Sequence, residues 1–168
     1  MNQKWTVTLG ALPRNPEELK ASGLLDFTKP QNIAALTVAA LDVCAADRET
    51  GYAMLDVLKG PQPLSPYEKQ FIRDRFMDKD YVPRSYFSGA APENNYTPSL
   101  PYTVVVEELP RSRDQESEGY LQLFLTSGGA DSPRGVKLRT KKSTGEWFLW
   151  EQFLLAGIRQ PVAADPWA

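Results

Sequence analysis

Hydrophobic positions in the first half of the chain recur at helical spacing, and several of these segments begin with a capping signal. Residues 15–18 read Asn-Pro-Glu-Glu and residues 65–68 read Ser-Pro-Tyr-Glu, so that a capping side chain, a proline and a glutamate occupy the positions they favour at a helix start. A weaker start at Thr28 opens a predicted helix of about 18 residues. Thr50 is expected to cap a further helix that ends at residues 60–61. Five residues of the long helix are expected on one face: Ile33, Leu36, Ala40, Val43 and Cys44.

The second half of the chain shows the alternation of β-strands. Strands are predicted over residues 102–109, 120–127 and 135–142, and a polar turn over residues 111–119. Residues 146–155 begin like a strand, but their apolar spacing also suits a short helix, and periodicity leaves both open. Three tryptophans follow the third strand: Trp147 and Trp150 are expected in the core, and Trp167 against its own domain or a neighbouring subunit.

Between these halves, residues 77–101 lose regular structure. Four prolines interrupt the segment, which also carries tyrosines and a phenylalanine. A stretch of this length without regular structure is usually a binding loop or a disordered linker, and the aromatic residues favour the loop.

This order of elements predicts an α+β fold in which N-terminal helices pack on a C-terminal antiparallel β-meander of three to four strands. The chain of 168 residues fits a single domain, 1–168. Within it we expect a helical part over about residues 15–76, a loop at 77–101 and a β-rich part at 102–158. Strand order is not predictable from this pattern.

Composition narrows the classes of function. The sequence has no histidine, which excludes a Ser-His-Asp triad and a Cys-His dyad. The only cysteine, Cys44, excludes an internal disulfide and a cysteine-rich zinc site, and is expected to be buried and inert. No metal or cofactor is expected, and the acidic pairs at 78–80 and 107–108 have no specific ligand spacing. No segment has the ~20 apolar residues of a membrane helix, and we expect a cytoplasmic protein.

Charge is distributed unevenly along the chain. The formal net charge is −2, yet residues 134–142 carry five basic residues and no acid, which leaves −7 on the rest of the chain. This pattern predicts one local positive site on an acidic protein, rather than binding to extended nucleic acid.

The positive segment follows a Gly-Gly turn, and together they predict an anion-binding hairpin. Two glycines that tolerate positive φ would let successive backbone N–H groups point at one anion, hydroxyl groups would add donors, and arginines would grip phosphate oxygens. If the strand alternates, Lys137 and Arg139 lie on one face and repel each other unless an anion neutralises them. The predicted ligand-binding residues are Ser127, Gly128, Gly129, Asp131, Ser132, Arg134, Lys137 and Arg139.

The aromatic loop is the expected second wall of this site. Its rings could stack on a nucleobase and its asparagines could contact a base edge. The residues concerned are Tyr86, Asn94, Asn95 and Tyr96. The alternatives are an ordinary turn beside a solvated basic strand face, and rings that plug the open end of the sheet.

Several runs resemble a known family when they are read together: GPQPLSPYEKQFIRDRF, PRSYFSGAAPENNYTPSLPY, SGGADSPRGVKLR, STGEWFLWEQFLLAGIRQP and the final DPW. They are similar to an uncharacterised family of small bacterial proteins, frequent in Firmicutes and found in phages, described only as a domain of unknown function. The resemblance covers roughly Thr28 to Trp167. It implies a single-domain cytosolic protein and carries no catalytic residues.

The sequence therefore predicts a non-catalytic binding protein for a small phosphorylated molecule, such as a nucleotide or cyclic nucleotide signal, with no membrane partner and as a candidate homo-oligomer. One alternative is a protein-interaction or phage accessory protein. The other is a carboxylate- or metal-dependent hydrolase, with Ser132 beside Lys137, or Asp131 or Glu151 as a base.

Overall fold

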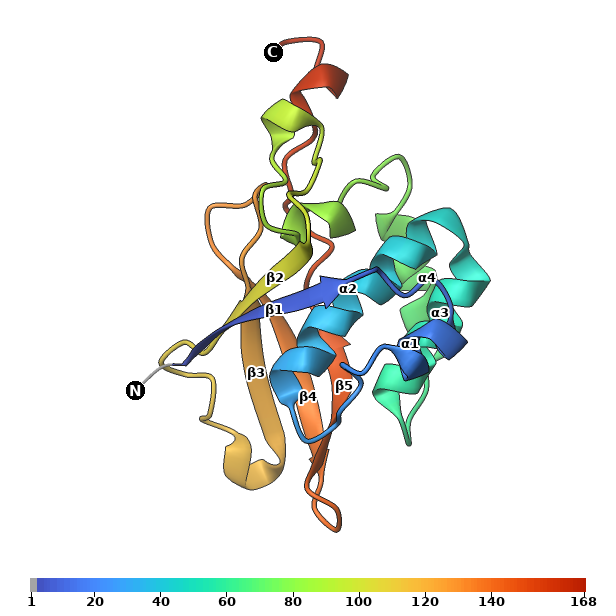
Figure 1. Ribbon diagram of the computed structural model, residues 1–168, viewed down its shortest axis with the longest axis vertical. Coiled ribbons are helices and arrows are strands. Elements are labelled where there is room, and N and C mark those ends of the chain that lie inside the picture. Colours follow the sequence, from blue (N-terminus) through green and yellow to red (C-terminus); the bar gives the residue numbers. More distant parts are fainter. Residues whose placement is uncertain (1–2) are drawn as a thin grey trace.

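The computed structural model describes residues 3–168 and contains helices and one sheet (Figure 1). The helices are α1 (Pro16–Ala21), α2 (Pro30–Ala46), α3 (Arg48–Lys59) and α4 (Pro66–Arg75). The strands are β1 (Lys4–Gly10), β2 (Tyr102–Glu107), β3 (Tyr120–Leu125), β4 (Arg134–Lys141) and β5 (Glu146–Gln152). Short 3-10 turns are η1 (Pro83–Tyr86), η2 (Pro92–Asn94), η3 (Glu116–Glu118) and η4 (Val162–Ala164).

The sheet is an antiparallel meander in the order β1-β2-β3-β4-β5, with helices on one face. The predicted α+β class is confirmed, but the sheet has five strands, where three to four were expected. The additional strand is β1, in which Lys4 pairs with Glu107 and Thr8 with Thr103. Its partner lies about a hundred residues away in sequence, so no local hairpin pattern marks the pairing.

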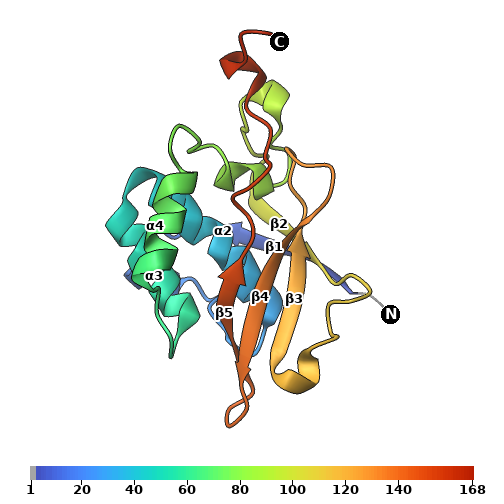
Figure 2. The same ribbon diagram turned by 180° about the vertical axis from the view of Figure 1, so that it is seen from behind.

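The ambiguous segment after residue 145 is a strand. β5 pairs with β4 along its length, with an irregularity opposite Lys137 and Leu138. It lies at the edge of the sheet, so one side of its backbone faces α3 and α4 (Figure 2).

The core lies between the sheet and α2. This helix is buried around nearly its whole circumference, because the sheet covers one side and α3 and the η1 region cover others. The prediction of a single apolar face for this helix was therefore too narrow, because residues outside that face are buried as well. Cys44 is buried, as expected.

Helix starts were predicted with mixed success. The Asn15 side chain accepts the Glu18 N–H at 2.8 Å, and Ser65 and Glu68 form a complete capping box on α4. The expected cap at Thr50 is wrong: Asp47 caps α3, and the N–H and hydroxyl of Thr50 both donate to its carboxylate. Thr28 likewise bonds Asp26 instead of capping α2.

The segment 77–101 is ordered, although it contains only short 3-10 turns. Ser88 N–H donates to the Thr103 carbonyl at 2.8 Å, and Phe87 bridges to Val104. Together with residues 154–168 it forms the part of the molecule that extends beyond the sheet towards the C-terminus (Figures 1 and 2). Trp167 lies on this extension and is 92% exposed, so the first of its two expected environments, its own domain, is wrong, and contact with a neighbouring subunit stays a prediction.

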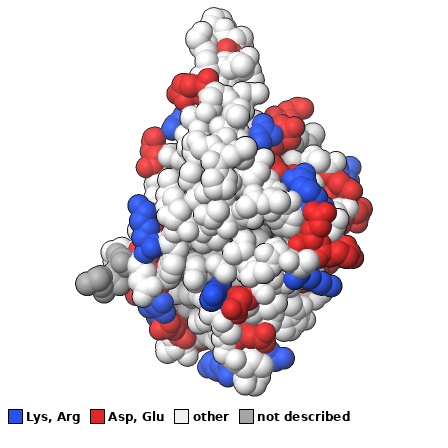
Figure 3. Space-filling view, in the orientation of Figure 1, with Lys and Arg blue, Asp and Glu red and all other residues white. Residues whose placement is uncertain are grey.

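Charged residues on the helix-bearing face are of both signs and lie mainly along its margins, with an uncharged band between them (Figure 3). Among residues 3–168, no helix has the length and apolar character needed to cross a bilayer.

Candidate functional site

The predicted anion-binding hairpin is held by hydrogen bonds to other parts of the chain. Ser127 is buried; its hydroxyl donates to the Ser85 hydroxyl at 2.8 Å and accepts the Gly129 N–H at 3.1 Å. Gly128 N–H donates to the Ser85 carbonyl at 2.8 Å. The two backbone N–H groups that were expected to point at an anion therefore already have acceptors within the protein.

The glycines of this hairpin have a packing role. Neither has positive φ, in contrast to the expectation. A Cβ on Gly128 would lie 1.9 Å from the Ala90 carbonyl oxygen, and one on Gly129 would lie 2.2 Å from the Tyr96 hydroxyl. Both positions need glycine because another segment passes so closely.

Arg134 and its neighbours are also bonded internally. The Arg134 guanidinium donates to the carbonyls of Ala156 and Gly157 and to the carbonyl and hydroxyl of Ser132, at 3.0–3.1 Å. Asp131 forms an ion pair with Arg159 at 3.0 Å, although its side chain is 97% exposed. These groups fasten the hairpin to the segment that follows β5.

The aromatic loop lies next to this hairpin, as predicted, but its rings are inside the protein. Tyr86 and Tyr96 are fully buried, and their hydroxyls donate to the carbonyls of Leu154 and Arg159. Tyr96 stacks on Tyr81 with ring centroids 5.4 Å apart. Burial raises the pKa of Tyr96 to about 12 and also raises that of Tyr86. No free ring face is left to stack on a base.

The asparagines shape the loop. The Asn94 side-chain oxygen accepts the N–H groups of Ala91 and Thr97, and its amide donates to the Gly89 carbonyl. Asn95 adopts left-handed backbone with φ 57° directly after η2. Ten of the twelve predicted site residues thus lie in one region, where most of their polar groups bond to each other or to neighbouring backbone.

Lys137 and Arg139 are separate from that region and lie on the outer face of the sheet, opposite α2. Lys137 Nζ lies 4.7 Å from the centroid of the Tyr120 ring, and Arg139 Cζ lies 5.5 Å from the same centroid. The Arg139 guanidinium also lies 4.6 Å from the Trp150 ring. Neither cation forms an ion pair within the described residues, although Glu151 is the cross-strand partner of Lys137.

We call Tyr120, Lys137, Arg139 and Trp150 the outer-face cluster. Tyr120 and Trp150 were not among the predicted site residues. Trp150 was expected in the core, but it is only partly buried and its ring contacts Arg139. The cross-strand pairing of Tyr120 with Arg139 brings the cluster together. Next to it is a hollow of about 290 Å³, lined by Arg111, Ser112, Asp114, Gln115, Tyr120, Leu121, Gln122 and Lys137.

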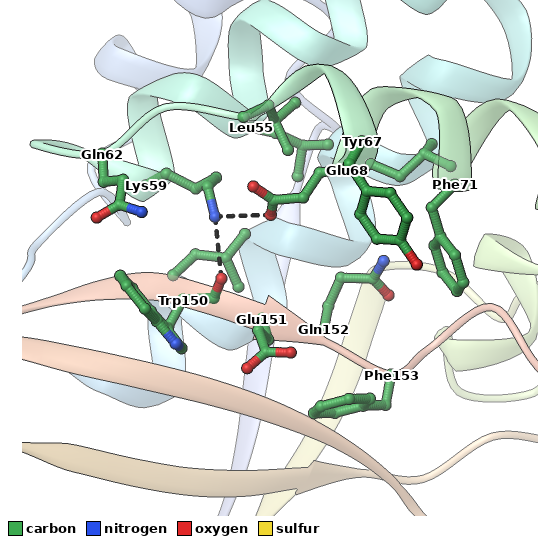
Figure 4. Close-up of a pocket in the computed structure, with 13 residues that line it drawn as sticks. Leu55, Lys59, Gln62, Tyr67, Glu68, Phe71, Trp150, Glu151, Gln152 and Phe153 are labelled. Carbon is green, nitrogen blue, oxygen red and sulfur yellow. Dashed lines mark hydrogen bonds and ion pairs between the residues drawn. The ribbon is translucent and has the colours of Figure 1, made fainter.

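A larger groove lies between α4 and the edge strand β5 (Figure 4). We call it the β5 groove; its volume is about 410 Å³. Its floor is aliphatic, and aromatic side chains stand on both walls: Tyr67 and Phe71 on the α4 side, Trp150 and Phe153 on the other. Tyr67, Phe71 and Phe153 are among the most exposed large apolar residues of the protein, at 78%, 37% and 48%.

Lys59 supplies a buried charge to this groove. Its side chain is only 4% exposed, and Nζ donates to Glu68 Oε2 at 3.0 Å and to the Trp150 carbonyl at 2.9 Å (Figure 4). Burial works to raise the pKa of Glu68, but the Ser65 backbone N–H and Lys59 outweigh it and lower the pKa overall. The lysine charge is therefore balanced by one carboxylate.

Two of the residues considered for catalysis, Cys44 and Glu108, are buried. Burial raises the pKa of the Cys44 thiol to about 12, so the thiolate is suppressed at neutral pH. Glu108 is buried and paired with Arg113. Among residues 3–168, no three acidic or sulfur ligands are grouped as a metal site would require.

The comparisons with known proteins give a family. A family model described as "Domain of unknown function (DUF6935)" matches residues 11–162 of the chain. No curated protein and no solved structure matches the chain.

Proposed function

The chain belongs to the DUF6935 family, and we propose that it is a non-catalytic binding protein whose outer-face cluster holds a small phosphorylated ligand. The matched region covers both halves of the fold, including every residue of that cluster. The ligand class is the one that the sequence suggests, but the binding site lies on the strand face beyond the tip of the hairpin.

The observation that carries the proposal is the convergence of two unpaired cations on one ring. Lys137 and Arg139 both lie against Tyr120, and no carboxylate neutralises either charge within the described residues. Like charges held together repel each other, and an anion between them removes this cost. A phosphate group has the charge and the acceptor oxygens to do so.

The Arg139 guanidinium forms no ion pair within the described residues. Its Cζ lies over both rings, 5.5 Å from the Tyr120 centroid and 4.6 Å from the Trp150 centroid, and its N–H donors can grip phosphate oxygens in bidentate fashion. Lys137 adds a point charge to the lining of the 290 Å³ hollow, to which Arg111 contributes a third cation. Asp114 lies in the same lining and limits the net positive charge of the hollow.

We propose binding without turnover. The chain has no histidine to act as a general base near neutral pH, and the cations of the cluster serve to hold an anion. The Cys44 thiol is buried away from the surface.

The test is to measure binding of a panel of mononucleotides, cyclic nucleotides and sugar phosphates by melting shift and by calorimetry. The double variant Lys137→Ala/Arg139→Ala should lose at least tenfold in affinity, because each charge-assisted contact is worth about 1.5–3 kcal/mol. The control is Lys20→Ala/Arg48→Ala, which removes the same charge from two exposed helical positions. Equal affinity in the two double variants, or no binding in the native chain, would refute the proposal.

The same mixtures separate capture from catalysis. After denaturation, a bound compound recovered unchanged supports a binding protein. A chemically altered compound would instead support the hydrolase alternative.

A protein-interaction role is the second candidate. The extension beyond the sheet exposes Trp167 at 92% and Val162 at 43%, which is typical of a contact surface. It predicts a discrete assembly in size-exclusion chromatography that Trp167→Ala dissolves, without a melting shift by any phosphorylated compound. A cytoplasmic location, a bacterial or phage origin and a homo-oligomeric state also belong to the proposal.

A further inference from the structure

The β5 groove and the outer-face cluster meet at one side chain. The Trp150 ring lies 4.6 Å from Arg139 Cζ and 6.0 Å from Lys59 Nζ. A smaller hollow of about 230 Å³ is lined by residues of both sites, including Arg139, Lys59 and Gln62. A single small ligand lying across Trp150 can therefore contact Arg139 and the groove at once.

We propose that the β5 groove takes the planar heterocycle of this ligand, so that the phosphorylated molecule is a nucleotide whose base enters the groove. This inference rests on the proposed function, since it uses Arg139 as the phosphate contact. The outer-face cluster would bind the phosphate of the nucleotide, and the β5 groove would bind its base.

The walls of the groove favour a flat aromatic ligand. Four aromatic side chains line the groove: Tyr67 and Phe71 come from α4, and Trp150 and Phe153 from β5 and the residue after it (Figure 4). The volume of about 410 Å³ lies within the usual range for small-molecule pockets. Bases stack on such rings with little dependence on sequence, because every base has an aromatic face.

Polar groups in the lining of the groove favour a neutral heterocycle over a second anion. Glu68 already balances the charge of Lys59, so an additional carboxylate or phosphate beside Glu68 would be repelled. The structure gives the Lys59 ammonium two acceptors, and an ammonium has three donors. A ring carbonyl or ring nitrogen supplies a third acceptor without adding charge.

Two amides can contact the edge of such a heterocycle. Gln62 and Gln152 line the groove, and each carries donors and an acceptor. The Gln152 oxygen accepts the Leu154 N–H at 2.9 Å, which fixes that side chain and leaves its NH2 group to donate. This combination suits a nucleobase better than a hydrocarbon, because a nucleobase edge presents both donors and acceptors.

The experiment compares a nucleotide with its own phosphate-bearing part. Calorimetric titrations use adenosine 5′-monophosphate, guanosine 5′-monophosphate, cyclic dinucleotides and ribose 5-phosphate, which lacks a base. We expect at least one nucleotide to bind about tenfold or more tightly than ribose 5-phosphate, as stacking of one base predicts.

Phe71→Ala should remove this advantage and leave binding of ribose 5-phosphate unchanged. Phe71 is 37% exposed, so its truncation is not expected to unfold the protein. The matched control is Met77→Ala, which removes an exposed apolar side chain just beyond α4 and outside the groove lining.

The outcomes distinguish this inference from the function on which it rests. If all nucleotides and ribose 5-phosphate bind equally, or if Phe71→Ala weakens both to the same extent, the inference fails while phosphate binding stands. If neither binds, or if Lys137→Ala/Arg139→Ala binds normally, the proposed function fails and the inference fails with it.

Discussion

In the predicted anion-binding hairpin, residues that are needed for close packing have the same types as residues of a ligand-binding site. Gly128 and Gly129 were expected to open the backbone to an anion, yet each lies against another segment of the same chain. Ser127 likewise directs its hydroxyl to Ser85 instead of outwards. The residue types are those of an anion site, but their partners are carbonyls and hydroxyls of the protein.

This packing gives the first stability prediction. Gly129→Ala would place a Cβ 2.2 Å from the Tyr96 hydroxyl, and Gly128→Ala would place one 1.9 Å from a backbone carbonyl oxygen. Each substitution should lower the free energy of unfolding by about 1–3 kcal/mol, measured by urea denaturation.

Gly135→Ala is the control for this pair. Its added Cβ meets the end of the Gln122 side chain, which can rotate away, so the loss should be smaller. Equal losses at all three positions would contradict the close approach of the Ala90 carbonyl to Gly128 and of the Tyr96 side chain to Gly129.

Among the elements, α4 is held mainly at its first turn. Ile72 is its only buried residue. The helix is otherwise attached by the capping box of Ser65 and Glu68, by the ion pair of Lys59 with Glu68, and by the Tyr52 hydroxyl on the Lys69 carbonyl. One wall of the β5 groove therefore depends on a few polar contacts.

The pH dependence of α4 follows from Glu68. Its pKa in the folded protein is below the ordinary value of 4.5, so its contribution is present above that value and is lost as pH falls through the lowered pKa. Hydrogen-exchange protection of residues 66–75 should therefore decrease on acidification below about pH 4.5, after correction for intrinsic exchange.

Glu68→Gln should abolish most of that decrease and lower protection already at pH 7. Glu49→Gln, an equal change of charge in the first turn of α3, should leave residues 66–75 unaffected. If the protection of residues 66–75 in Glu68→Gln depends on pH as it does in the native protein, α4 is held by other contacts.

At the scale of the whole molecule, three titratable groups are buried in the core: the Cys44 thiol and the hydroxyls of Tyr86 and Tyr96. Cys44 lies in α2, and Tyr86 and Tyr96 bond carbonyls beyond β5. Burial raises the pKa of Cys44 from 9.0 and of Tyr96 from 10.0, each to about 12, and it raises the pKa of Tyr86 as well. The folded protein thus keeps protons that the unfolded chain releases.

Stability should consequently fall in alkali. The contribution of each group is complete below its unfolded pKa, and it is lost as pH rises from there through the raised folded value. The free energy of unfolding, measured in urea at a series of pH values, should decline from about pH 9 upwards, by up to about 1.4 kcal/mol per pH unit for each such group.

Cys44→Ala should shift the onset of this decline from about pH 9 to about pH 10, where the tyrosines begin to ionise in the unfolded chain. A free energy of unfolding that stays level between pH 8 and pH 11 in the native protein would contradict the burial of these three groups.

Local patterns in the sequence determined the class of fold and much of its secondary structure. Helix starts at Asn15 and Ser65 follow from capping groups within three residues, and the alternation of β4 puts Lys137 and Arg139 on one face. These effects act between neighbours in the chain, so a single sequence reveals them.

Tertiary structure alone decided which polar groups are available to a ligand. Donors of Ser127 and Gly128 are used by Ser85, and those of Arg134 by the carbonyls of Ala156 and Gly157. The β5 groove exists because α4 lies beside an edge strand some eighty residues further along the chain. The pairing of β1 with β2 is likewise distant. Such contacts form between segments that are far apart in the sequence, and they produce no local pattern of hydrophobic positions. The candidate site therefore had to be located in three dimensions.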